Sequence, residues 1–137
     1  MRYMLLIYTR EDERAIRTEE QMEEIKNGHL AAMQEARGKG VLEAAEPLAG
    51  TRTATTVRLQ NGKPLITDGP FAETREQLAG YYILDCRDLD EAIVWAQKIP
   101  TGCGGLNGCV EIRPLPGLGE RPMAMAGNAA AGTARNA

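Results

Sequence analysis

The amino-acid sequence predicts a single α+β domain of the ferredoxin-like βαββαβ type, with an inserted β-hairpin. Three observations predict this class. Residues 3–8 and 80–86 are β-prone and apolar on both alternating faces, as central strands are. Each of these segments is followed by one in which apolar residues recur at helical spacing. Between the two halves, an Asn-Gly pair separates two strand-like segments, which indicates a hairpin.

The first helix is expected to begin at a capping box. Thr18 is followed three residues later by Gln21, so a hydroxyl and a side-chain amide can each satisfy a free N–H group at the helix start. The charged stretch 9–17 that precedes it is interpreted as a loop, and Gly38 and Gly40 are expected to end the helix. The residues that recur at helical spacing and should face the sheet are Met22, Ile25, His29, Ala32, Met33 and Ala36.

The middle of the chain is predicted to be β-structure. Residues 41–48 form a candidate second strand, closed by a glycine. Residues 53–59 alternate in character, Asn61-Gly62 follows, and residues 63–67 continue as a strand. Because Asn-Gly supplies the positive φ values that a type I′ turn needs, these two strands should form a tight hairpin.

The last third of the chain is predicted to hold a second helix between two strands. A short helical turn is expected at residues 74–78, before the central strand. Asp88 is the expected N-cap of the helix, with Glu91 at the capping-box position, and Pro100 should stop it. A final alternating strand is expected at residues 110–113. The buried stripe of the helix is predicted to be Leu89, Ala92, Ile93 and Ala96, with Trp95 and Ile99 at its edge.

Length and composition set the class of protein and exclude several functions. The 137 residues suit one domain, predicted at 1–116, and the Ala/Gly-rich residues 117–137 are expected to be a disordered tail. The net charge of −3 and the lack of a basic block argue against nucleic acid. No apolar run approaches the ~20 residues of a membrane span, and the start of the chain resembles a strand rather than a signal peptide. We therefore expect a cytoplasmic protein.

Cysteine usage points to neither a disulfide framework nor a metal site. The chain has three cysteines, an odd number. Cys103 and Cys109 flank a glycine-rich loop without the spacing or the nearby histidine of a zinc site. That loop is not a phosphate-binding loop either, because Asn107 stands where G-x-G-x-x-G needs glycine and the loop leads from a helix into a strand. We expect no metal and no cofactor.

The two apolar strands predict a homodimer. Both helices of this fold lie on one face of the sheet, so the other face of strands 3–8 and 80–86 would be an exposed apolar patch. The simplest cover is the same face of a second copy, packed at about 10 Å.

His29 and Asp68 are the candidate catalytic residues. His29 is the chain's single histidine, and its place on the apolar stripe points it toward the sheet, where it is a general acid–base group or a core histidine bonded to a backbone carbonyl or a carboxylate. Asp68 ends a strand and is either a turn-forming residue or the group that orients His29. The candidate binding residues are Gly69 and Pro70, which make a rigid corner, and Phe71, the only phenylalanine, which can wall a pocket or belong to the core.

The run from Asp68 to Tyr82, DGPFAETREQLAGYY, strongly resembles the signature of DGPF-domain proteins, a branch of the YCII-related family. Further segments carry the same likeness, which covers roughly residues 1–115: 2–8, 55–58, 88–92, 99–100 and 110–115. The resemblance implies a dimeric α/β-barrel fold and a His and an Asp that face a shared pocket, which fall here on His29 and Asp68. It also implies small-molecule chemistry of the lyase type in some relatives, and an association with extracytoplasmic-function sigma factors.

Three functions are consistent with the sequence. The first is an enzyme that acts on an unidentified small molecule. In it, His29 moves a proton and Asp68 orients the imidazole of His29. The second is a non-catalytic ligand-binding or regulatory module that acts with a sigma factor. The third is a structural dimer. A contact between His29 and Asp68, direct or through one water, at the edge of a cavity would separate the first function from the other two. A His29 sealed among aliphatic side chains, with no cavity, would contradict the first.

Overall fold

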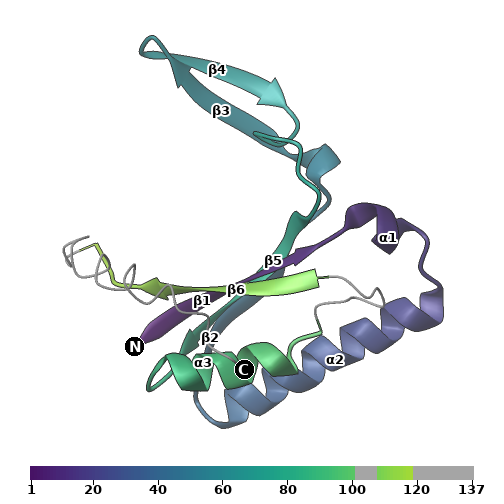
Figure 1. Ribbon diagram of the computed structural model, residues 1–137, viewed down its shortest axis with the longest axis vertical. Helices are drawn as coiled ribbons and strands as arrows, with labels where there is room; N and C mark the ends of the chain where they lie inside the picture. The colour runs from purple at the N-terminus through teal and green to yellow at the C-terminus, as the bar shows by residue number, and fades with distance from the viewer. Residues whose placement is uncertain (101–107, 119–137) are drawn as a thin grey trace.

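The protein is built on a four-stranded antiparallel sheet with two helices on one face (Figure 1). The computed structural model describes residues 1–100 and 108–118. The strand order β2-β5-β1-β6 puts the two strands predicted to be central at the centre. This α+β arrangement is compatible with the predicted ferredoxin-like class. The strands of the sheet are β1 (Arg2–Thr9), β2 (Leu42–Pro47), β5 (Gln77–Asp85) and β6 (Gly108–Leu115).

The longest helix, α2 (Glu19–Gly38), begins at the predicted capping box. The N–H of Gln21 donates to the Thr18 hydroxyl at 3.1 Å, and the N–H of Thr18 donates to the Gln21 side-chain oxygen at 3.0 Å. This reciprocal pairing fixes the start of the helix at Glu19. None of the helices in the described part of the chain is both long enough and apolar enough to cross a membrane.

The second helix that covers the sheet, α3 (Leu89–Lys98), is capped by Asp88 as predicted. The N–H of Glu91 donates to the Asp88 carboxylate at 2.9 Å. The Glu91 carboxylate, however, accepts the N–H of Arg87 at 2.9 Å, one residue before the position that a capping box would use. The helix is therefore held by two carboxylates at its start.

Two local predictions are wrong. The charged stretch predicted as a loop contains a short helix, α1 (Glu11–Ala15), which has no apolar periodicity and no side-chain N-cap that could have revealed it. The helical turn expected at residues 74–78 is absent from this described segment, because β5 begins at Gln77 and pairs there with Thr9 of β1. Pairing with β1 overrides the local preference of this segment.

The core lies between the sheet and the two helices. Trp95 and Ile99, predicted at the edge of the α3 stripe, are each 5% exposed and belong to the core, so that prediction is wrong. The buried stripe of α3 is thus wider than the helical spacing of its apolar residues suggested. The reason is that β6 and the end of α2 cover the two sides of this stripe. The buried cluster is Tyr3, Leu5, Ile7, Ala36, Val41, Tyr82, Leu84, Cys86, Ala92, Trp95 and Ile99.

The opposite face of the sheet is apolar at its centre. In the register of β1 against β5, Leu5 lies opposite Tyr82 on the helix side, whereas Leu6 lies opposite Tyr81 on the other side. Met4 and Ile83 form the next pair on that other side, and all four of its side chains are partly exposed. No helix of the described residues covers this face (Figure 1), which we call the helix-free face.

A hairpin leaves the body of the protein on the side away from α2 and α3 (Figure 1). Strands β3 (Thr55–Gln60) and β4 (Lys63–Asp68) pair only with each other and form a separate two-stranded sheet. The turn has φ values of 51° at Asn61 and 78° at Gly62, as the predicted type I′ turn requires. We call residues 55–68 the arm; a short 3₁₀ helix, η1 (Thr51–Thr53), leads into it.

Candidate functional site: a cavity between helix and sheet

A cavity of about 530 Å³ lies between α2 and the sheet, on the side of edge strand β2. Its volume is in the range of small-molecule sites. Most of its lining is apolar, with few polar groups. The lining residues are Ile7 of β1, Arg14 of α1, Met22, Ile25, Lys26, His29, Leu30 and Met33 of α2, Ala45, Glu46 and Pro47 of β2, and Ala79, Gly80 and Tyr82 of β5.

One face of α2 supplies the wall of the cavity. Met22, His29 and Met33 recur at intervals of seven and four residues and therefore lie along one side of the helix. This spacing is the basis on which the sequence predicts that these residues face the sheet. The structure adds that the sheet presents the small residues Ala45 and Gly80 to the same cavity, and these leave space that larger side chains would fill.

His29 is hydrogen-bonded to Tyr82 at the wall of this cavity. Its Nδ1 lies 2.8 Å from the Tyr82 hydroxyl, and the two rings stack at 29° with centroids 6.0 Å apart. Tyr82 comes from β5, 53 residues later in the chain, and points to the helix side because of its place in the β1–β5 register. Within residues 1–100 and 108–118, the partner of His29 Nδ1 is thus a phenol rather than the backbone carbonyl or carboxylate of the core alternative.

Burial shifts both members of this pair toward their neutral forms. It lowers the pKa of His29 below its ordinary value of 6.5. It raises the pKa of Tyr82 to about 12. At neutral pH the site therefore holds a neutral imidazole beside a protonated phenol.

Gly80 lines the cavity where β5 and β2 approach each other closely. A Cβ atom at this position would lie 2.9 Å from the carbonyl oxygen of Glu46 and 3.3 Å from Cα of Pro47. Both of these atoms belong to the backbone of β2, so a side chain at residue 80 would push that strand away. The absence of a side chain lets β2 approach β5 closely beside Tyr82.

Three charged side chains line the cavity. Arg14 and Lys26 carry positive charge and Glu46 negative charge. The set has one excess positive charge, next to the neutral His29–Tyr82 pair. Such a lining favours an anionic group on an otherwise apolar molecule.

Asp68 lies apart from this cavity. It is the last residue of β4, its side chain is exposed, and it is not among the residues that line the cavity. No hydrogen bond joins it to His29 within the described chain, where His29 bonds Tyr82 instead. The structure of one chain thus does not bring the two predicted catalytic residues together.

The residues after Asp68 form the corner by which the arm rejoins the body. Gly69 has a φ of 102° and donates its N–H to the Ala54 carbonyl at 2.7 Å, which ties the two sides of the arm together. Pro70 is exposed, and Phe71 is 70% exposed. The alternative that Phe71 belongs to the core is therefore wrong for the single chain, and none of the three lines the cavity.

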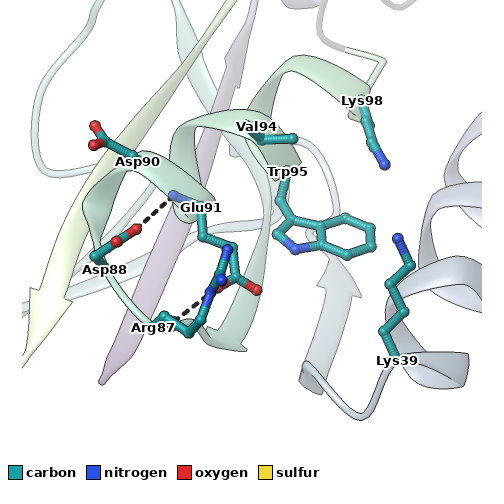
Figure 2. Close-up of a pocket in the computed structure, with 8 residues that line it drawn as sticks. All are labelled: Lys39, Arg87, Asp88, Asp90, Glu91, Val94, Trp95 and Lys98. Atoms are coloured by element: carbon teal, nitrogen blue, oxygen red, sulfur yellow. Dashed lines mark hydrogen bonds and ion pairs between the residues drawn. The ribbon is translucent and has the colours of Figure 1, made fainter.

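A smaller hollow of about 350 Å³ lies over α3 (Figure 2). In Figure 2 the ring of Trp95 lies beside the amino groups of Lys39 and Lys98, which are 5.6 and 4.6 Å from its centroid. The charges here satisfy one another: Arg87 pairs with Glu91 at 2.9 Å, and Lys98 pairs with Glu35 at 2.6 Å. We assign no ligand to this surface.

The second member of the pair, Tyr82, was not predicted from the sequence. It stood within the DGPF-like run, in an apolar strand, and no local pattern links it to His29. The alternation of β5 could have placed it on the helix side, but the match with His29 depends on the helix position along the sheet. The predictions that concern Cys103 and the glycine-rich loop 102–108 lie almost entirely outside the described residues, as does the tail from residue 119.

The fold and cavity define an α+β domain that encloses a hollow between its long helix and its sheet. Comparison of the sequence identifies the family: residues 1–116 match the YCII-related domain, and the chain belongs to the YCII-related family. An uncharacterized protein of Rhizobium meliloti (strain 1021) is 35% identical over 115 residues, which cover 84% of this chain and 92% of that protein.

Proposed function

We propose that this protein is an enzyme that binds a small molecule in the α2–sheet cavity, with His29 as general acid–base and Tyr82 as its partner. The observation that carries the proposal is the 2.8 Å hydrogen bond between His29 Nδ1 and the Tyr82 hydroxyl at the wall of a 530 Å³ cavity. A perturbed titratable group beside a mainly apolar cavity is a frequent feature of catalytic sites.

The tyrosine lets the imidazole act in either direction. A hydroxyl both donates and accepts, so Tyr82 supports both tautomers of neutral His29. When Tyr82 donates to Nδ1, Nε2 carries the proton and donates a hydrogen bond to the ligand; when Nδ1 donates to Tyr82, Nε2 is a base, and the imidazolium formed by accepting a proton is the acid that returns it. Because burial keeps His29 neutral at pH 7, the base form needs no prior deprotonation. General acid–base help of this type is worth about 10²–10⁴-fold in rate.

The lining defines the class of ligand. The cavity takes a compact apolar molecule with one anionic group, which Arg14 and Lys26 bind while the apolar body contacts Met22, Ile25 and Met33. A small carboxylic acid or an acid-bearing lactone has this chemistry.

Asp68 remains a predicted member of the site. Its carboxylate ends β4, outside the cavity lining, so contact with His29 would need a movement of the arm or an Asp68 from a second copy. Asp68→Asn tests this: ligand affinity falls if the carboxylate acts at the site and is unchanged if Asp68 only shapes the corner. Gly69, Pro70 and Phe71 also remain predicted binding residues, because they lie at the same corner as Asp68.

Ligand binding is measured by thermal shift against a panel of small carboxylic acids, lactones and their neutral amides. We expect stabilisation by anionic members, since a ligand that binds only the folded state raises its stability. Tyr82→Phe and His29→Gln should lower turnover of the bound molecule. Tyr81→Phe is the matched control, because Tyr81 is the neighbouring residue of β5 and points to the helix-free face. No stabilisation by any member, or equal effects of the two tyrosine variants, would contradict the proposal.

The alternative function is a non-catalytic ligand-binding or regulatory module. It predicts the same thermal shift but no product, so chromatography of the incubated ligand separates the two functions. The sigma-factor association stays a prediction from the DGPF resemblance, and co-purification with the cell's sigma factors tests it. The DGPF branch itself and the cytoplasmic location also stay predictions.

Homodimerisation through the helix-free face, in the manner of a dimeric α/β barrel, is part of the same proposal. The partly exposed Met4, Leu6, Tyr81 and Ile83 support it, because apolar side chains at the centre of an open sheet face gain from burial.

A further inference from the structure

We propose that the arm is an interaction surface whose partner is a second copy of this chain. In the β3–β4 register, Val57 lies opposite Ile66 and Leu59 opposite Pro64, so these four side chains share one face of the hairpin. We call this set the apolar face of the arm. The inference concerns a surface outside the cavity; it rests on the proposed dimerisation through the helix-free face and not on the proposed enzymatic function.

The apolar face of the arm is bare in the single chain. Val57 is 63% exposed, Leu59 78% and Ile66 67%. The opposite face of the hairpin carries Thr56, Arg58, Gln60, Lys63 and Thr67, with Leu65 as its one large apolar residue. Apolar side chains gathered on one face of an exposed ribbon mark a contact surface, whereas a solvated hairpin would need no such division.

The arm is anchored at its base by specific bonds. The Glu11 carboxylate accepts the N–H and the hydroxyl of Thr51 at 2.8 and 2.7 Å, which fixes the entry to the arm. At the exit, the Arg58 guanidinium donates to the Phe71 carbonyl at 2.7 Å. These bonds hold the base of a two-stranded sheet that is itself only marginally stable without a packed face. In the single chain the arm therefore lacks the packed face that would stabilise it.

The direction of the arm identifies the partner. The arm rises on the same side of the sheet as the helix-free face (Figure 1). A second copy seated on that face, at the sheet spacing of about 10 Å, lies beside the arm. Six-residue strands reach about 20 Å, so the arm extends past the plane of the partner's sheet. By two-fold symmetry each copy receives the other's arm, and both bare surfaces of the chain are covered at once.

The test is a double variant on the apolar face, Leu59→Thr with Ile66→Thr. Threonine keeps the β-branched preference for strands but removes apolar surface. The control, Gln60→Thr with Lys63→Thr, changes a facing pair on the opposite side of the same arm. Light scattering after size exclusion at micromolar concentration should show dimers for wild type and control. The apolar-face variant should raise the dimer dissociation constant at least about tenfold.

Two further measurements keep the result interpretable. Far-UV circular dichroism should show the same helix content for all three proteins, since α2 and α3 lie outside the arm. Hydrogen exchange should be slow in residues 55–68 of wild type and fast in the apolar-face variant or on dilution. A monomeric wild type overturns the proposal, whether or not the arm then binds vesicles or another protein. Equal dissociation constants for variant and control overturn it as well.

Discussion

His29 is distinguished from a surface histidine by the three groups around it. Tyr82 bonds its Nδ1, the apolar side chains of α2 remove water from the ring, and the excess positive charge of Arg14 and Lys26 stands at the same cavity. The second of these, burial, disfavours the imidazolium ion and lowers the pKa of His29. The predicted partner, Asp68, would have favoured that ion, so exchanging a carboxylate for a phenol changes the resting state of the site from charged to neutral.

A single histidine makes this prediction directly measurable. In a ¹⁵N-histidine NMR titration, the pKa of His29 should lie below 6.5 in the folded protein and return to its ordinary value in urea. Tyr82→Phe should change the Nδ1 chemical shift at neutral pH, because the hydrogen bond is lost. Tyr81→Phe should leave it unchanged. A folded-state pKa at or above 6.5 would refute the burial that we describe.

At the scale of secondary-structure elements, the cavity lies between α2 and the sheet, where β2 and β5 approach each other closely. Gly80 permits this approach, since a Cβ atom there would lie 2.9 Å from the carbonyl oxygen of Glu46. The β-bulge between Ile7 and Tyr8, opposite Ala79, adds local twist at the same place. The strand pairing at this point therefore shapes the ligand site.

Gly80→Ala should destabilise the protein by about 1–3 kcal/mol, because the new methyl group overlaps backbone atoms that cannot move alone. It should also weaken ligand binding by displacing β2. Gly38→Ala is the control: a Cβ there meets nothing within 4 Å, and alanine in a helix is favoured over glycine by up to about 1 kcal/mol. Urea unfolding of the two variants measures both effects. Equal stability of Gly80→Ala and wild type would show that β2 is not held closely against β5.

The elements that could be predicted from the sequence are those with local causes. Thr18 and Gln21 bond each other, and Asn61-Gly62 makes its turn without help from the rest of the chain. His29 and Tyr82 are 53 positions apart and no local signal links them, because their contact depends on strand register and helix placement together. For the same reason, the sequence of α3 alone predicts Trp95 at the edge of the buried stripe. The contact of its ring with Lys39, at the end of α2, is not visible in that local pattern.

At the scale of the whole molecule, the chain has a closed side and an open side. The helices bury one face of the sheet, and the arm leaves the body on the side of the other face (Figure 1). Exposed apolar side chains lie on the arm, and partly exposed ones lie on that other face. A net charge of −3 opposes association only weakly. The cavity is lined by residues of one chain, on its closed side.

Global stability should fall as the pH is lowered below about 6.5, the ordinary histidine pKa. Burial lowers the pKa of His29 in the folded state, so the unfolded chain binds a proton first, and stability present above 6.5 is lost as the pH falls toward the folded-state pKa. The slope cannot exceed about 1.4 kcal/mol per pH unit for one proton.

Urea unfolding between pH 7.5 and 5.5 should show this slope in wild type and lose it in His29→Gln. Carboxylates do not account for it, because those with shifted values, such as Glu35 and Glu91, have pKa values lowered from 4.5 and titrate below this window. A pH-independent wild type would mean that His29 is as well solvated in the folded protein as in the unfolded chain.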